Sequence, residues 1–359
     1  MIRFTLREFR TQAVVALAVL LIAAVVLAIT GANIANLYNT TVANCQASND
    51  CATATSAFLA TDNQLQSILN DLIVLVPALL GVFWGAPLIA RELEAGTHRL
   101  AWTQSVTRTR WLATKVGVVG VCALLVTGLL SLMVTWWFSP IDRVTSNVFG
   151  SFDQRDIVPI AYAAFAFALG ATSGALLRRT IPAMGTTLVV FVAVRLAVLD
   201  WVRPNFMAPL RRTVPDSVFR SLPTGGLHAS ITAAQLTAAQ SGALPVNAWL
   251  ISGQTLNAAG DVVGQNGLLA GAINFTPDAG GFGLTIQGAG TCPDVSPTPP
   301  INPGPMIQKC IDQLHLREVL TYQPASRYWP FQWFEVAIFL ALALALVGLC
   351  FWWIRRRAT

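Results

Sequence analysis

Six long apolar runs, separated by charged or polar segments, set the pattern of this chain. They cover residues 13–31, 72–90, 112–138, 158–177, 181–199 and 333–354. Each has roughly the 20 residues that an α-helix needs to cross the hydrocarbon core of a bilayer. Pro77 and Pro87 in the second run are tolerated where neighbouring helices surround them. The pattern therefore predicts six transmembrane helices, with both chain ends on the same side of the membrane.

The composition favours the same class of protein. Of the 359 residues, 54% are hydrophobic and only 11% are charged, whereas soluble proteins carry roughly 25% charged residues. So few charges cannot cover a water-facing surface, so we expect an all-α integral membrane protein surrounded by lipids. The net charge of +6 does not indicate a nucleic-acid partner, because basic residues that flank membrane helices give the same balance.

The first 31 residues allow two interpretations. A basic start before an apolar run is typical of a signal peptide, but this run is longer than a signal core of roughly 7–15 residues and no clear cleavage site follows it. We expect a retained first helix. Within residues 1–12, Ile2, Leu6 and Phe9 recur at helical spacing, which predicts a cytoplasmic interfacial amphipathic helix. A basic anchor that only fixes the topology is the alternative.

Basic side chains indicate the orientation. Thirteen of the 23 Lys and Arg residues lie beside run ends on one side, whereas the opposite loop, residues 32–71, has none. Positive charge marks the cytoplasmic side, so we expect a multi-pass protein of the bacterial plasma (inner) membrane with both termini in the cytoplasm. The thirteen are Arg3, Arg7, Arg10, Arg91, Arg99, Arg108, Arg110, Lys115, Arg178, Arg179, Arg355, Arg356 and Arg357.

Residues 200–330 are too polar to enter lipid and are rich in Gly, Pro, Asn, Gln and Thr. Helix-like stretches at 231–240 and 306–320 and strand-like stretches at 248–255 and 283–287 predict an extracytoplasmic α+β insertion between helices five and six. The aromatic segment 319–335 predicts an interfacial helix that leads into the last domain, residues 331–359, which holds helix six and a basic tail.

Four cysteines lie in the segments assigned to the oxidising side. Cys45 and Cys51 belong to the first outer loop, and Cys292 and Cys310 to the insertion. Each pair closes a short loop, which predicts the disulfides Cys45–Cys51 and Cys292–Cys310. Four free thiols are the alternative.

Three features inside or beside the runs predict local structure: a glycine pair, a short connection and a charged residue. Gly170 and Gly174 form a GxxxG pair that permits close helix approach; we favour packing within one chain over a dimer interface. Residues 178–182 predict a tight inner hairpin. Arg195 is a functional candidate because charge at membrane depth is costly. It lies near the outer end of its run, so we prefer a side chain that reaches to the interface, with Glu335 as a candidate partner.

Several kinds of chemistry are missing from the sequence. There is no G-x-x-x-x-G-K-[ST], so the chain has no P-loop for ATP. The three histidines lie far apart without metal-ligand spacing, and no Ser/His/Asp arrangement is evident. An ion-coupled carrier would need several ionisable groups spread through the membrane, and the runs lack them. We expect no enzyme activity, no metal and no cofactor in this chain.

The charged connector between the second and third runs is GAPLIARELEAGTHRLAWTQSVTRTRWLATK, residues 85–115. Arg91, Glu94 and His98 are spaced along one helix face, and Gly96-Thr97 interrupts the helix before a short amphipathic piece. A solvated cytoplasmic loop would explain the charge alone. The order of the residues favours a surface that docks a soluble partner.

This connector resembles that of the permease subunits of type-2 ABC exporters, and is most similar to those of actinobacterial type. The resemblance rests on E-x-G-T at 94–97, R-T-R-W opening the third run, and YQPASRYWPFQWFE at 322–335. It implies a homodimer or paired permeases, joined by two copies of a separate ABC ATPase that binds ATP and Mg. It also implies that loop 91–111 carries a coupling helix and that helices one, two and five line the substrate path.

We therefore expect a permease subunit that exports a drug, antibiotic, lipid-like or peptide compound with energy from another chain. A membrane sensor or scaffold whose outer domain binds a ligand is the alternative. By resemblance the ATPase-coupling residues are Arg91, Glu92, Glu94, Gly96, Thr97, His98, Arg99, Trp102, Gln104, Arg108 and Arg110.

Overall fold

The computed structural model describes residues 2–43, 45, 58, 73–96, 107–144, 148–215, 244–245, 247–265, 273–278, 281–286, 290–292, 313–315 and 317–357. The chain divides into two compact units. One contains Met1–Thr145, Ser151–Phe206 and Trp329–Thr359, and the other contains Ser146–Gly150 and Met207–Tyr328. We call the first the helical unit and the second the strand unit, and describe each by itself.

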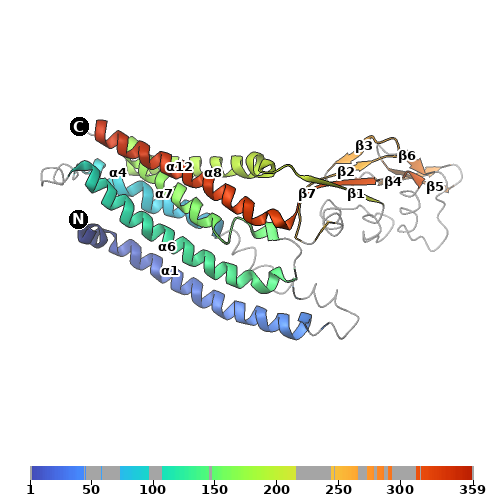
Figure 1. The fold of residues 1–359 in the computed structure, drawn as a ribbon, viewed down its shortest axis with the longest axis horizontal. Coiled ribbons are helices and arrows are strands. Elements are labelled where there is room, and N and C mark those ends of the chain that lie inside the picture. Colours follow the sequence, from blue (N-terminus) through green and yellow to red (C-terminus); the bar gives the residue numbers. More distant parts are fainter. Residues whose placement is uncertain are drawn as a thin grey trace. The chain divides into compact units, whose positions relative to one another are not determined.

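The helical unit confirms the six predicted spans (Figure 1). Described residues include six helices long and apolar enough to cross a membrane: Phe9–Val42, Ile73–Glu94, Arg108–Asp142, Val158–Leu177, Thr180–Asn205 and Ala325–Arg356. The first contains α1 (Ile2–Leu37) and the π-helix η1 (Tyr38–Val42). The helix α1 begins at Ile2, before the first span begins at Phe9, and the interfacial position of segment 1–12 stays a prediction.

A π-helix lies within span two, and short π or 3-10 turns lie at the ends of spans one, five and six. Span two contains the π-helix η3 (Gly81–Gly85) followed by α4 (Ala86–Glu94). The third and fourth spans are α6 (Arg108–Asp142) and α7 (Val158–Leu177). Span five is α8 (Thr180–Ala197), extended by η5 (Val198–Val202) and η6 (Arg203–Asn205). The last span is α12 (Tyr328–Arg357), which follows the 3-10 turn η7 (Ala325–Arg327).

The helix α7 is the core of the helical unit, because most of its length is buried. Its glycines let span two approach closely. A Cβ on Gly170 would lie 2.2 Å from the Gly81 carbonyl oxygen, and one on Gly174 would lie 2.5 Å from that of Ala86. Gly81 and Gly85 return the contact, facing the carbonyl oxygens of Ala166 and Phe167. The GxxxG pair therefore packs within one chain, as predicted.

The outer helices of the unit present apolar side chains on their exposed faces. Leu17 and Ile22 of α1, Leu132 of α6 and Val189 of α8 are each more than half exposed. In water such a surface would be unfavourable. It is the surface expected of helices that face lipid or another membrane-embedded chain.

The strand unit contains two antiparallel sheets (Figure 1). The four-stranded sheet has the order β1-β7-β2-β3, and the three-stranded sheet has the order β4-β5-β6. The strands are β1 (Leu210–Pro215), β2 (Trp249–Leu256), β3 (Val262–Gln265), β4 (Ile273–Asp278), β5 (Gly281–Ile286), β6 (Gly290–Cys292) and β7 (Arg317–Gln323). The strand-like stretches 248–255 and 283–287 are thus found as β2 and β5.

The predicted helix at 306–320 is wrong over residues 317–320, whereas Gln313 is helical and residues 306–312 lie outside the described residues. Residues from Arg317 onward form β7, a central strand paired with β1 and β2. Its side chains alternate, with Glu318 and Leu320 buried on one face, and this period of two overrides the helical reading. The aromatic segment 319–335 likewise begins as strand and turns helical only at Tyr328. Residues 231–240 lie outside the described residues.

Candidate functional site

The end of span two at Glu94 contains the first group of predicted site residues. The helix α4 ends at Glu94, and the Ala95 N–H donates to the Arg91 carbonyl at 2.9 Å. Gly96 then adopts φ +70°, the left-handed conformation that commonly ends a helix at glycine. The predicted interruption at Gly96 is therefore confirmed. Thr97, His98, Arg99, Trp102 and Gln104 lie outside the described residues, so their coupling role stays a prediction.

Two carboxylates on this end of α4 contact two other helices. Glu92 forms an ion pair with Lys115 of α6, whose ammonium group also lies 5.6 Å from the centre of the Trp111 ring. Glu94 accepts two hydrogen bonds from Thr180, the first residue of α8, through Oε2. Neither Lys115 nor Thr180 was among the predicted site residues; Lys115 ends the charged connector 85–115, and Thr180 lies in the hairpin predicted at 178–182.

The start of α6 is built for an exposed, basic surface. The Thr107 hydroxyl oxygen accepts from the Arg110 N–H at 3.4 Å and so caps the helix. Arg110 and Arg91 are exposed, and Arg108 is half-buried. Arg178 takes the left-handed conformation at φ 53° and joins α7 directly to α8, which confirms the predicted hairpin at 178–182. These residues give this end of the helical unit a positive surface.

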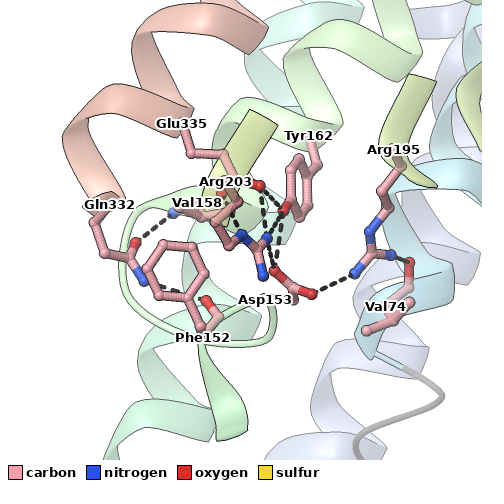
Figure 2. Close-up of polar contacts among 9 residues, drawn as sticks. All are labelled: Val74, Phe152, Asp153, Val158, Tyr162, Arg195, Arg203, Gln332 and Glu335. Atoms are coloured by element: carbon pink, nitrogen blue, oxygen red, sulfur yellow. Dashed lines mark hydrogen bonds and ion pairs between the residues drawn. The ribbon is translucent and has the colours of Figure 1, made fainter. Parts of the chain in front are cut away.

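A second polar group lies at the other end of these helices, and Figure 2 shows it. We call it the Asp153 cluster, after the loop residue at its centre. Arg203 contacts Asp153 and also donates to Glu335, through Nε at 2.9 Å and through Nη2 at 2.7 Å. Arg195 contacts Asp153 Oδ2 at 3.3 Å. The members are Asp153, Tyr162, Arg195, Arg203 and Glu335.

The cluster joins four elements of the helical unit. Asp153 comes from the α6–α7 connection, Tyr162 from α7, Arg195 and Arg203 from span five, and Glu335 from α12. The Tyr162 hydroxyl bonds to Glu335 and lies 3.1 Å from Asp153 Oδ1. Burial would raise the pKa of Asp153, but the charges of Arg203 and Arg195 outweigh it, so the pKa of this carboxyl lies below its ordinary value. Two carboxylates thus balance two guanidinium groups.

Neighbouring groups hold the cluster in place. Gln332 of α12 accepts from the Val158 N–H at 3.2 Å and donates to the Phe152 carbonyl at 3.1 Å (Figure 2). The Arg203 guanidinium lies 4.5 Å from the centre of the Phe152 ring. The loop that carries Asp153 is therefore fixed to the start of α12 by the two hydrogen bonds of Gln332, and to span five by the cation–π contact of Arg203.

The structure corrects the expected surroundings of Arg195. Its side chain is only 12% exposed and does not end in solvent. Its Nη1 donates to the Val74 carbonyl of span two at 3.2 Å, and its charge is met by Asp153 instead of Glu335. The predicted partner Glu335 binds Arg203. Because a buried charge needs a compensating charge, a partner was to be expected, but it comes from a loop distant in sequence.

Sequence reasoning missed Asp153, Tyr162 and Arg203. One signal was present: the short segment Ser151–Asp156 holds two aspartates and an arginine directly before an apolar run. Arg195 and Arg203 also lie eight residues apart, about two helical turns, and so fall near one face.

The structure describes only one cysteine of each predicted disulfide. Cys45 and Cys292 are buried, and the free thiols in the described part of the chain are Cys122 and Cys350. Cys51 and Cys310 lie outside the described residues, so both disulfide pairings stay predictions. No group of three or more His, Cys, Asp and Glu residues placed to hold a metal occurs within the described ranges.

An apolar groove of about 500 Å³ lies between α1, span two and α6. Thr11 and Gln12 lie at one end of its α1 wall, and the rest of the lining is apolar, including Leu80, Phe83 and Trp84. Such a lining accepts hydrocarbon and excludes charged groups.

Six apolar helices, each long enough to cross a membrane, define a multi-pass membrane protein. The sequence comparison then gives the family. The family described as ABC-2 membrane transporter related matches residues 17–203, more than half of the chain. The chain belongs to this family: it is a membrane component of an ABC transporter, not itself the catalytic subunit, and membership implies partnership with an ABC ATPase. No curated protein and no solved structure matches the chain.

Proposed function

We propose that this chain is the permease subunit of an exporter that is driven by ATP hydrolysis in a separate ABC ATPase. The observation that carries the proposal is the family match over residues 17–203, which covers the first five spans and the charged loop after span two. In the proposal, loop 91–111 docks in the ATPase, and two copies of the ATPase bind ATP and Mg. A homodimer of the chain completes the transporter.

Charge at the helix ends supports an orientation for this assembly. Arg91, Arg110, Arg179 and Arg356 lie at span ends on one side, and positive charge marks the cytoplasmic side. Both termini and loop 91–111 are then cytoplasmic in a bacterial plasma membrane, and the strand unit is extracytoplasmic. There the disulfides Cys45–Cys51 and Cys292–Cys310 can form.

The groove between α1, span two and α6 supports an apolar or amphipathic substrate class. Its lining offers hydrocarbon along most of its length and hydroxyl and amide groups only at Thr11 and Gln12. A drug-like or lipid-like compound fits this distribution better than a multiply charged solute does.

The test begins with the full chain, tagged and purified from its native membrane, and asks whether an ABC ATPase co-purifies. In reconstituted vesicles, Gly96→Val should reduce permease-dependent ATP hydrolysis, because a β-branched residue is strained at φ +70° and redirects the loop. Gly117→Val is the matched control: a Cβ at Gly117 meets no described atom within 4 Å, and no positive φ is recorded there. A chain that retains no ATPase would refute the proposal.

The orientation has its own measurement. Cysteine at Arg110 should react with a membrane-impermeant maleimide only from the cytoplasmic face, and cysteine at Asp261, in an exposed turn of the strand unit, only from the outside. The reverse labelling pattern would show that the topology is opposite to the proposed one. Loop 91–111 would then lie outside the cell, where a cytoplasmic ATPase cannot bind it.

A further inference from the structure

The carboxylate of Glu94 accepts hydrogen bonds from Thr180, the first residue of α8. Its Oε2 accepts the Thr180 N–H at 3.1 Å and the Thr180 hydroxyl at 2.8 Å. The first N–H groups of an α-helix have no partner within the helix. Side chains that satisfy them usually come from the residue just before the helix, but here the acceptor belongs to span two, 86 positions earlier in the sequence.

The residue directly before α8 does not cap this helix with its side chain. Arg179, which precedes α8, has an extended backbone, and among the described residues it supplies no side-chain cap. Pro182 has no N–H to satisfy, and the Ala183 N–H donates to the Arg179 carbonyl at 3.2 Å. Glu94 therefore supplies the cap that the sequence around α8 lacks. Its negative charge also suits the positive end of the helix dipole and the adjacent Arg179.

We propose that Glu94 is a positioning residue that carries movement of the coupling loop to α8 through this cap, and that it is not a contact to the ATPase. The inference rests on the proposed function, because it assigns the path by which a docked ATPase would move the membrane helices. Glu94 lies two residues before Gly96, where the chain turns into the loop. A displacement of the loop therefore reaches Glu94 before any other part of span two.

Contacts along the two helices make them move together. Ala86 and Ala90 of α4 pack with Ala183 of α8 in a cluster of small buried side chains. At the far end, Arg195 of α8 donates to the Val74 carbonyl of span two. Span two and α8 are thus joined by polar contacts at both ends and by alanine packing near the inner end. Without the Glu94–Thr180 bonds, the alanine packing remains, but the first residue of α8 is no longer bound to the end of span two from which the loop leaves.

Glu92 makes a different connection. It pairs with Lys115 of α6, which is almost fully buried. The ion pair of Glu92 therefore links this end of span two to α6, and the hydrogen bonds of Glu94 link it to α8. This division separates the effect of Glu94 from a general loss of charge in the loop.

The test uses the full chain with its co-purified ATPase in lipid nanodiscs. Hydrogen exchange is measured at the first turn of α8, with and without ATP plus vanadate, together with the amount of ATPase retained. The variants are Glu94→Ala, Glu94→Gln and Thr180→Val. Thr186→Val is the control for Thr180→Val, because the Thr186 hydroxyl bonds only to the Pro182 carbonyl among the contacts described for α8.

Glu94→Ala should retain the ATPase, speed exchange at the first turn by roughly fivefold, as expected for loss of an N-cap, and abolish its dependence on nucleotide. Thr180→Val should act in the same direction, and the double variant should be no worse than Glu94→Ala. Glu94→Gln keeps an acceptor oxygen and should preserve most of the nucleotide response. Thr186→Val should match the wild type.

Three outcomes would overturn the inference. Glu94→Ala could release the ATPase while Thr180→Val keeps it, which would make Glu94 a direct contact. Glu94→Ala could keep the nucleotide response, which would place the path elsewhere. A wild-type chain that binds no ATPase would refute the proposed function and the inference with it, and that result is distinguishable because it needs no variant.

Discussion

Replacing Glu335 with glutamine tests whether the Asp153 cluster stabilises the helical unit. The substitution preserves the size of the side chain but removes one of the two negative charges that face Arg195 and Arg203. The Glu335 side chain is 1% exposed and accepts two hydrogen bonds from Arg203, at 2.9 and 2.7 Å. The variant therefore leaves one net positive charge in a buried site.

Removing one partner of a buried, hydrogen-bonded ion pair typically destabilises a protein by about 3–5 kcal/mol, because the other charge stays buried without compensation. Two features place Glu335→Gln near the lower end, at about 3 kcal/mol. Glutamine keeps an oxygen that can accept from Arg203, and Asp153 still faces both guanidinium groups. Adding Arg203→Gln restores a neutral pair of Asp153 and Arg195, so the double variant should lose less than the sum of the two single variants.

The free energy of unfolding is measured on the full chain in mixed micelles by SDS titration, with tryptophan fluorescence as the signal. Asp200→Asn is the matched control, because it makes the same acid-to-amide change at an exposed position of span five, the span that carries Arg195 and Arg203. Its effect should stay within about 0.5 kcal/mol. The reasoning fails if Glu335→Gln is no more destabilising than the control, or if the effects of Glu335→Gln and Arg203→Gln add without coupling.

Two further predictions use the same unfolding assay. Gly170→Ala should destabilise by about 1–3 kcal/mol, because its Cβ would meet the Gly81 carbonyl at 2.2 Å. Gly185→Ala, where a Cβ meets no described atom within 4 Å, should be neutral or stabilising by up to about 1 kcal/mol; equal losses at the two sites would exclude the packing explanation. Because the Asp153 pKa is lowered in the folded state, its contribution to stability is complete above the unfolded pKa of about 3.9 and is lost as pH falls below it. Between about pH 4 and pH 2, wild-type stability should therefore fall more steeply than that of Asp153→Asn, and parallel slopes would refute the assignment.

The helical framework could be predicted because its signals are local. An apolar run of about 20 residues specifies a membrane span without knowledge of its neighbours, and Arg178–Thr180 between two such runs leaves room only for a tight turn. The packing of Gly170 and Gly174 could be anticipated as close helix approach. Their partners, Gly81 and Gly85, could be identified only in three dimensions.

The polar contacts could not be predicted in the same way. Asp153 meets Arg203 and Arg195 across 50 and 42 positions of sequence, and no spacing rule connects a loop to a later helix. Glu94 was predicted as a coupling residue, but its bond to Thr180 depends on how two hairpins pack. The strand β7 was missed because its alternation becomes decisive only when β1 and β2 lie on either side of it.

The arrangement of contacts around α8 explains why both polar groups matter for one helix. The buried side chains of α8 that the structure describes are Ala183, Thr187 and Phe191, a single stripe at intervals of four residues. This narrow stripe sets the distance between α8 and its neighbours. It offers little resistance to sliding of α8 along its own helix axis. Resistance to sliding must come from directional contacts, namely the hydrogen bonds of Glu94 at the first residue and the ion pairs of the Asp153 cluster, made by Arg195 in the last turn and Arg203 beyond it. A helix fixed in this way can be shifted by changing its end contacts without repacking its length, which suits a helix that conveys a signal from one membrane face to the other.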